Sequence, residues 1–480
     1  MSLSLSLLAD SRKRAVIYPV DLVGGTAPLF ACGITKLRSA YAGNCMQVFR
    51  TSDSTTLNIG FVGAKVDAAA IDAFLGGGQT GHISIWYDQS GNGNDITQTV
   101  DASRPLIEGA SVTGGQPITL GGLPCPVFNS HTMNLAAALS TSRQANSFYM
   151  AAETYGFNYP SCFVQLGSST NQATLFLGAV TSQTGYLRAN PATGNSTFKP
   201  QSRVSIYQSI LSATASTAQQ NSEVISAAAA TALTMTGGTI GKTDLGSFPG
   251  QYYAGAIINY GRALSTSEDS AMQTALNGLF GITPNPSGRI VFFGDSITAG
   301  SNGPALVWFG FAKMATRYLP SRHMYALGQG GTQVNVRLPF YANETGAILA
   351  QYSDTRVVLV AIGTNDLTIG ARTAAQIYAD LQTYCGNVRT SGGKVVIATI
   401  LPNNAWTAGQ QTTRTTVNTN IQTNWATFAD GLCDFAADAT MGPQAAAANT
   451  ALYSDGLHPT RFGHVTYLAP IVQAALSALI

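Results

Sequence analysis

Three residues in the C-terminal part of the sequence have the types and spacing that acyl transfer by a serine requires. Ser296 follows the apolar run 290–293 and a Gly-Asp pair, so it comes directly after a predicted strand, and we expect it at the N-terminus of the next helix. Asp455 and His458 lie together on the short segment Asp455-Gly-Leu-His458-Pro. A serine nucleophile needs a base within reach of its hydroxyl and an acceptor that fixes the tautomer of that base. The pattern supplies all three groups.

Two further segments follow predicted strands and supply hydrogen-bond donors. Gly-Gln-Gly-Gly-Thr at 328–332 leaves backbone N–H groups free to point into a cleft, where they stabilise a developing oxyanion. Gly-Thr-Asn-Asp at 363–366 adds an amide donor. A Gly-Asp-Ser tripeptide by itself is also ordinary turn chemistry, so the prediction of catalysis rests on all four segments together.

Short apolar runs alternate with segments of helical length after residue 289. The apolar runs occupy 289–293, 324–327, 357–362 and 394–400, and the helical segments occupy 373–389, 412–428 and 461–479. Buried parallel strands between helices predict a three-layer α/β/α domain. The active site of such a domain lies at the carboxyl edge of its strands, where the four segments fall.

These four segments, in this order, resemble the SGNH/GDSL hydrolase family over residues 289–480. The resemblance implies that Ser296 is the nucleophile, that His458 is the general base and acid, and that Asp455 orients His458. It also implies an oxyanion hole formed by the N–H of Ser296 together with Gly331 and Asn365. The second segment of this family often begins with Asn, and Ala326 stands at the matching position here, which removes a supporting side chain.

The first half of the chain has the pattern of an all-β domain. From about residue 18 to 260, short alternating or aromatic-rich runs are separated by clusters of Gly, Asn, Ser and Asp, which favours a two-sheet sandwich. The stretch 221–232 fits either a helix or a strand. Ser265 and Glu268 form a capping box for a helix that ends near 278–281.

The Pro-rich segment that follows this helix cannot continue a regular element and marks a boundary. The sequence therefore predicts a multidomain chain with an N-terminal extension, a β-sandwich, a linker and a hydrolase domain, over 1–17, 18–281, 282–288 and 289–480 respectively.

Two segments of the predicted sandwich also carry a resemblance. Trp86-Tyr87-Asp88-Gln-Ser-Gly-Asn-Gly-Asn is similar to the catalytic sandwich of arabinofuranosidase B type enzymes, and 255–268 looks like the closing strand and helix of concanavalin A-like, laminin-G-like domains. Both point to a jelly-roll sandwich of the carbohydrate-binding kind. Trp86 and Tyr87 are candidates for stacking on a sugar ring, although strand alternation lets only one of them face outward. The family's acidic catalytic residues find no match here, and Asp88 fits Asx-turn geometry better than catalysis.

Composition excludes several other functions. The 25 basic and 23 acidic side chains give a net charge of +2 without a basic stripe, so we expect no nucleic-acid partner. No uninterrupted apolar window is long enough for a membrane span, and residues 1–9 lack the charge that precedes a secretion signal. The six cysteines have no metal-binding spacing, so we expect buried free thiols, with a Cys32–Cys45 bridge as the alternative, and no metal or cofactor.

Together these features predict a serine esterase that removes acyl groups, acetyl foremost, from a carbohydrate held by the sandwich. A general lipase or thioesterase is one alternative. A glycan-binding adhesin of a phage tail or cell surface, with secondary esterase activity, is another. The low charge and the abundance of Gly, Ser and Thr favour an extracellular or virion-surface location, and the sequence leaves a homo-oligomer open.

Overall fold

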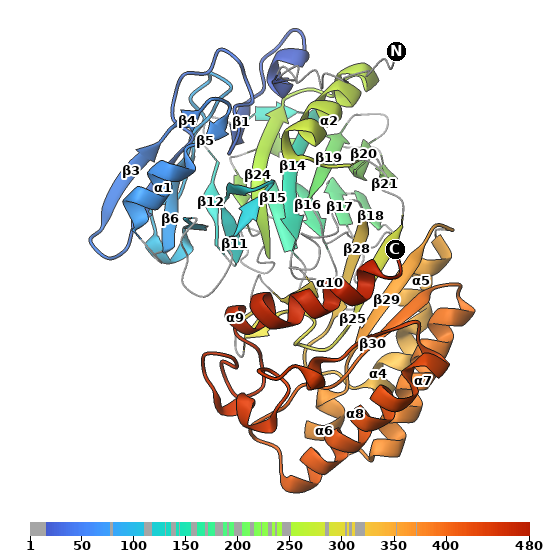
Figure 1. Cartoon of the computed structure of the whole chain (residues 1–480). Helices are drawn as coiled ribbons and strands as arrows, with labels where there is room; N and C mark the ends of the chain where they lie inside the picture. The colour runs from blue at the N-terminus through green and yellow to red at the C-terminus, as the bar shows by residue number, and fades with distance from the viewer. Residues whose placement is uncertain are drawn as a thin grey trace, which may run out of the picture.

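A computed structural model of the chain describes an N-terminal β-rich half and a C-terminal α/β half, which lie one above the other in Figure 1. The described residues are 16–480 except 77–79, 110–117, 130, 136–140, 144, 155–160, 169–170, 178–185, 190–191, 196–203, 212–215, 222, 229–232, 236–237, 242–250, 284–287, 303–304, 307–309, 313–321, 352 and 371. The predicted N-terminal extension and linker therefore lie largely outside the described residues.

The N-terminal half is built from antiparallel strands around one hydrophobic core. Its centre is β14 (Asn146–Thr154), which pairs with β24 (Gln251–Tyr260) on one side and β19 (Ser205–Leu211) on the other. Further strands are β1 (Phe30–Gly33), β2 (Met46–Arg50), β3 (Thr55–Ile59), β6 (Thr80–Trp86), β7 (Ile96–Thr97), β8 (Leu106–Glu108), β11 (Val127–Asn129), β12 (Met133–Asn134), β15 (Ser161–Ser168), β16 (Asn171–Leu177), β17 (Tyr186–Ala189), β18 (Ala192–Asn195), β20 (Ser216–Gln220), β21 (Glu223–Ala228) and β23 (Gly238–Ile240). The open stretch 221–232 thus contains a strand.

Two helices accompany these strands. Helix α1 (Ala68–Leu75) begins at an Asp67 cap. Helix α2 (Thr266–Phe280) begins at the predicted capping box, in which Ser265 and Glu268 satisfy each other's backbone donors. It ends at Gly281, whose left-handed backbone (φ 62°) a residue with a side chain adopts less readily.

The C-terminal half contains a five-stranded parallel sheet in the order β28-β25-β29-β30-β31. The strands are β25 (Arg289–Gly294), β28 (His323–Gly328), β29 (Arg356–Ala361), β30 (Lys394–Ala398) and β31 (Gly431–Cys433). All five strands run the same way, but the order in which the chain adds them reverses at β25, the first strand: β28 lies on one side of it, and β29, β30 and β31 follow on the other. In parallel sheets of this kind, ligands bind at the carboxyl ends of the strands around that point.

Helices cover both faces of the sheet. Successive residues of its strands point to opposite faces, so each face packs against its helices in a separate core. Ile290 and Phe292 belong to a core that includes Val472 and Leu476 of α10 (Ala469–Ser477). Val291 and Phe293 belong to another core that includes residues of α7 (Ala374–Thr390) and α8 (Ala408–Phe428). Shorter helices are α4 (Val334–Arg337), α5 (Thr345–Gln351), α6 (Thr364–Thr368) and α9 (Arg461–Gly463). The predicted fold class, an all-β sandwich followed by an α/β/α domain, is confirmed.

Two details differ from the sequence-based expectation. The last helix is interrupted, because a π-helical turn over His464–Leu468 separates α9 from α10. Strand β31 at the edge of the sheet has only three residues, too few for a periodic pattern to reveal.

Cys32 and Cys45 are buried free thiols and form no bridge with each other, as the sequence analysis favoured. None of the helices that the structure describes has the length and hydrophobicity needed to span a bilayer.

Candidate active site

The side chains of Ser296, His458 and Asp455 form a continuous hydrogen-bonded chain. The Nε2 atom of His458 lies 2.9 Å from Oγ of Ser296, and its Nδ1 atom lies 2.7 Å from Oδ2 of Asp455. A carboxylate only accepts, so Nδ1 carries the proton of a neutral imidazole and Nε2 is left to accept the serine hydroxyl proton. The geometry is that of a nucleophile, a base and a group that orients the base.

A compact turn at the end of β25 presents Ser296. The Oδ1 atom of Asp295 accepts the backbone N–H of Ile297 at 3.0 Å, and the backbone oxygen of Asp295 accepts the N–H of Ala299. Gly300, with φ 78°, then turns the chain away. The sequence analysis expected Ser296 at the N-terminus of a helix, and this expectation is wrong: residues 296–300 form turns, because the positive φ at 300 ends the helical path.

Two glycines allow this turn to pack between strands. A Cβ at Gly294 would lie 2.0 Å from Oγ1 of Thr298 and 2.3 Å from the backbone oxygen of Ala361. A Cβ at Gly328 would lie 2.4 Å from the backbone nitrogen of Ala299. No side chain fits at either position, so both glycines are needed to bring β28 and β29 close to the serine turn.

The loop that carries His458 is held in place by hydrogen bonds between residues of the loop itself. The Oδ1 atom of Asp455 accepts the N–H groups of Leu457 and His458, and the backbone oxygen of His458 accepts the N–H of Ser454. Burial raises the pKa of Asp455, but the hydrogen bonds from His458 and Leu457 outweigh burial and bring this pKa below its ordinary value. Asp455 therefore carries a negative charge at neutral pH, as an orienting group requires.

Of the two segments proposed for the oxyanion hole, 328–331 lies beside the nucleophile, and Asn365 is hydrogen-bonded to the residue that follows it. A Cβ at Gly330 would be 3.8 Å from Cβ of Ser296, which places the 328–331 segment against the serine. Gly331 has φ 72°. Asn365 is 7% exposed, and its Nδ2 donates to the backbone oxygen of Thr332 at 3.1 Å. An amide nitrogen has two hydrogens, so a second donor is left on Asn365.

Two buried carboxyl groups, Asp295 and Asp366, accept backbone hydrogen bonds from the segments that form the site. Burial raises the pKa of Asp295 to about 6, although the hydrogen bond from Ile297 lowers it. Burial also raises the pKa of Asp366, which accepts from Arg372 and from the N–H of Val334. Asp366 thereby ties the start of α4, which follows the 328–332 segment, to the Asn365 turn.

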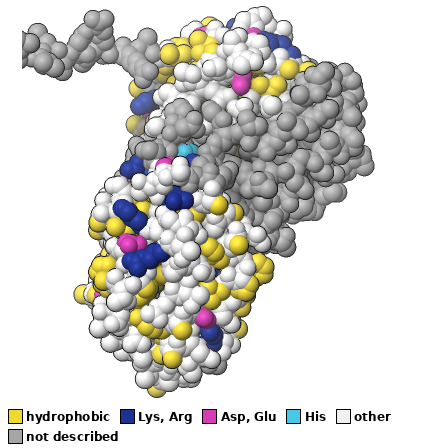
Figure 2. Space-filling view, turned by 90° about the vertical axis from the view of Figure 1, so that its right-hand side faces the viewer, with side chains coloured by type: hydrophobic (Ala, Val, Ile, Leu, Met, Phe, Trp, Pro, Cys, Tyr) yellow, Lys and Arg dark blue, Asp and Glu magenta, His cyan; other side chains and the backbone are white. Residues whose placement is uncertain are grey.

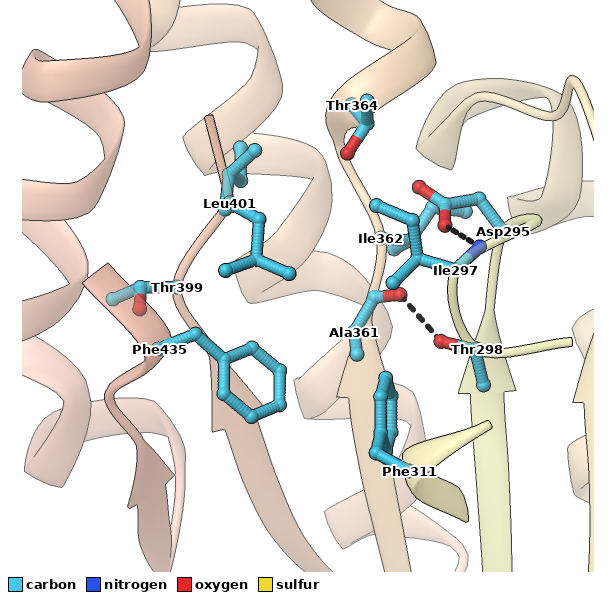
Figure 3. A pocket seen from close by; sticks show the side chains of 11 residues that line it. Asp295, Ile297, Thr298, Phe311, Ala361, Ile362, Thr364, Thr399, Leu401 and Phe435 are labelled. Atoms are coloured by element: carbon cyan, nitrogen blue, oxygen red, sulfur yellow. Dashed lines mark hydrogen bonds between the residues drawn. The ribbon is translucent and has the colours of Figure 1, made fainter. Parts of the chain in front are cut away.

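A small pocket lies at the carboxyl ends of β25, β29 and β30. Figure 3 shows the apolar side chains of Ile297, Phe311, Leu401 and Phe435 converging on it. Asp295 lines the pocket as well, whereas Ser296 and His458 do not. The pocket therefore lies beneath the serine turn and does not contain the reactive hydroxyl.

The structure separates the two proposed sugar-binding aromatics. Trp86 is 0% exposed and belongs to the sandwich core, so it cannot stack on a sugar, and its assignment as a binding residue is wrong. It occupies the inward position of a half-buried strand. Tyr87 is partly exposed, and its hydroxyl donates to Asn58. Asp88 accepts the backbone N–H groups of Ser90 and Asn94 in its own loop, which is turn geometry, and that of Ala31 in β1.

His323 and His464, which lie outside the catalytic segment, are both buried. Nδ1 of His464 accepts the N–H of Phe311, and burial lowers the pKa of His464 to about 3.

Within the described part of the chain, no group of three or more His, Cys, Asp or Glu residues is arranged to hold a metal ion. Figure 2 shows Lys and Arg side chains scattered over one face of the described surface.

An ion pair between the two halves of the chain escaped the sequence analysis. Nη1 of Arg461, three residues after His458, donates to Oε1 of Glu108 at 2.8 Å. The two residues are 353 positions apart and belong to no shared motif, so no sequence signal could have paired them.

Two known families match separate parts of the chain. Residues 292–465 match the GDSL-like lipase/acylhydrolase family. The matched range includes Ser296, Asn365 and His458, and we refer to this part of the chain as the GDSL-like domain. Residues 19–198 match the catalytic domain of α-L-arabinofuranosidase B.

Curated relatives match the sandwich half. α-L-Arabinofuranosidase B from Emericella nidulans is 34% identical over 177 residues, which is 34% of this chain and 34% of the relative. An α-L-arabinofuranosidase from Hypocrea jecorina is 36% identical over 168 residues, 32% of this chain and 33% of the relative. The chain thus spans about a third of the length of these relatives.

Solved structures resemble each half separately. An arabinofuranosidase complexed with arabinofuranosyl-α-1,2-xylobiose is 19% identical and covers 55% of this chain and 65% of its own, with a TM-score of 0.47. A GDSL-family lipolytic protein from Veillonella parvula is 22% identical and covers 40% of this chain and 100% of its own, with a TM-score of 0.34. An acetyl-xylooligosaccharide esterase from Geobacillus is 15% identical and covers 40% of this chain and 93% of its own, with a TM-score of 0.30.

Proposed function

We propose that the protein is a serine esterase that removes acyl groups, acetyl foremost, from a carbohydrate through an acyl-enzyme intermediate. One observation supports this most strongly: the imidazole of His458 is hydrogen-bonded to Ser296 on one side and to Asp455 on the other. A GDSL-like hydrolase domain that contains this arrangement acts on esters.

The proposed reaction has two halves. Oγ of Ser296 attacks the acyl carbon while its proton passes to Nε2 of His458, and His458 then gives that proton to the departing sugar hydroxyl. Water attacks the resulting serine ester with its proton again taken by His458. The serine hydroxyl regains this proton as the carboxylic acid leaves. Asp455 balances the imidazolium charge in both halves.

The negative oxygen that forms at the acyl carbon needs donors. The backbone N–H groups of Ser296 and Gly331 and the side-chain amide of Asn365 fill this role in the proposal. Their segments follow three neighbouring strands, β25, β28 and β29, whose carboxyl ends meet at the same edge of the sheet. Donors placed in advance at this edge stabilise the transition state without reorganisation.

The carbohydrate part of the proposal comes from the sandwich. Its matches are to α-L-arabinofuranosidases, and about a third of their length is covered. We propose that residues 18–281 hold an acylated glycan for a hydrolase domain at 289–480, with 282–288 as the linker. An extracellular or virion-surface location and a homo-oligomer complete this proposal.

Acetate release from an acetylated polysaccharide such as acetylated xylan tests the function. The wild-type chain should release acetate, Ser296→Ala should not, and Ser391→Ala, a serine on the far side of the sheet, should match the wild type. Retained acetate release by Ser296→Ala would contradict the proposal.

Two measurements separate the alternatives. A general lipase or thioesterase would prefer long-chain over acetyl p-nitrophenyl esters. An adhesin would bind glycan with the full-length Ser296→Ala chain while the wild type showed no turnover of acylated glycans.

A further inference from the structure

We infer that Glu108 of the sandwich is a positioning residue for the catalytic base, acting through Arg461. This inference rests on the proposed function, because it concerns the loop that carries His458. It gives the sandwich a part in the chemistry beyond holding a substrate.

The pair is buried at the junction of the two halves. The side chain of Arg461 is 11% exposed and that of Glu108 is 10% exposed. The second carboxylate oxygen of Glu108 accepts the backbone N–H of Ile118 at 2.9 Å, so the sandwich itself holds this carboxylate in place. Removing one partner of such a pair leaves the other charge buried and uncompensated, which costs far more than the loss of a surface ion pair.

The link from Arg461 to His458 is short and tightly bonded. Thr460 caps α9 by accepting the N–H of Gly463, and its own N–H donates to the backbone oxygen of Leu452. The backbone oxygen of His458 accepts the N–H of Ser454. The segment 452–461 therefore moves as one unit, and a displacement of Arg461 displaces the imidazole.

No buried hydrophobic cluster of the described residues is shared between the two halves. Such residues of the sandwich form one cluster, and those of the GDSL-like domain form two others. The Glu108–Arg461 pair is therefore a contact between the catalytic loop and the sandwich that no shared buried core duplicates. A base displaced by about 1 Å loses much of its catalytic effect.

Steady-state kinetics with p-nitrophenyl acetate test the inference, because this small ester needs no glycan-binding surface. Glu108→Gln and Arg461→Gln should each lower kcat about tenfold while KM changes less than twofold. The double variant should be no slower than either single variant, since both break the same link. Arg461→Lys should recover part of the activity because it restores the charge.

Arg389→Gln is the matched control. It breaks an ion pair with Asp430, whose other carboxylate oxygen accepts the N–H of Val395 near the start of β30, at the end of the sheet away from Ser296. Its kcat should equal that of the wild type. Thermal unfolding shows which variants are folded, and if Glu108→Gln is not, Glu108→Asp and Arg461→Lys take its place.

Several outcomes would overturn the inference. They are an unchanged kcat in folded Glu108→Gln, a rise in KM alone, or additive losses in the double variant. Failure of the proposed function looks different, because wild-type protein would then hydrolyse no ester and Ser296 would not react with a fluorophosphonate.

Discussion

The imidazole of His458 reaches the hydroxyl of Ser296 at 2.9 Å across 162 positions of sequence. The serine follows the first strand of the sheet and the histidine precedes the last helices, so only the folded sheet edge brings them together. The loop of His458 holds its own carboxylate, Asp455, and this makes the base and its orienting group one local unit.

Asp455→Asn should lower kcat by about 10⁴-fold with little loss of stability. The amide oxygen still accepts the N–H groups of Leu457 and His458, so the loop keeps its shape. The amide cannot balance an imidazolium, and it favours the wrong tautomer of His458. Kinetics with p-nitrophenyl acetate measure the effect, and a loss of less than tenfold would exclude Asp455 as the orienting group.

Asn365→Ala should lower kcat by about 10² to 10³-fold and leave KM nearly unchanged, because the oxyanion exists only in the transition state. Asn343→Ala, an exposed asparagine outside the site, serves as the control and should behave as wild type. An effect of Asn365→Ala on KM alone would show that this side chain binds substrate and does not stabilise the oxyanion.

Asp295→Asn should change the pH dependence of stability. The folded-state pKa of Asp295, about 6, lies above the ordinary value of 3.8, so the wild type loses stability between about pH 4 and 6, where this carboxyl ionises in the unfolded chain but stays protonated in the folded one. Asparagine never ionises and still accepts the N–H of Ile297. The variant should gain up to about 3 kcal/mol over the wild type at pH 8, and nothing at pH 4. Denaturant unfolding at both pH values measures this, and an equal difference at both would refute it.

Gly294→Ala should destabilise the GDSL-like domain by about 2 to 4 kcal/mol, because its Cβ would overlap backbone and side-chain atoms. Gly278→Ala is the opposite case. It lies in α2 with no atom within 4 Å of a new Cβ, so it should stabilise the chain by about 0.5 to 1 kcal/mol. Chemical denaturation compares the two, and a neutral Gly294→Ala would contradict the packing of the serine turn.

Local sequence signals predicted most of the fold. The box of Ser265 and Glu268 starts α2 as expected, because both donors and acceptors lie within four residues. The four longer parallel strands were visible because they are buried on both faces and read as apolar runs. Ser296, Gly331 and Asn365 were visible because each lies shortly after the end of a strand, and Asp455 and His458 because they lie three residues apart on one short segment before the last helices.

Other features depend on contacts between distant residues. The break in the last helix brings His464 against Phe311, and the inward position of Trp86 depends on the register of β6 in the sandwich. The contact between Glu108 and Arg461 joins two domains whose separate patterns carry no information about each other. No local periodicity encodes these relationships.

Fluorophosphonate labelling followed by peptide mass spectrometry tests the central claim most directly, because the reagent forms a stable adduct only with an activated serine. The account predicts one adduct on the peptide that contains Ser296 in the wild type, and none in Ser296→Ala or His458→Ala. An adduct on another residue, or full ester hydrolysis by protein in which Ser296 is replaced, would contradict it.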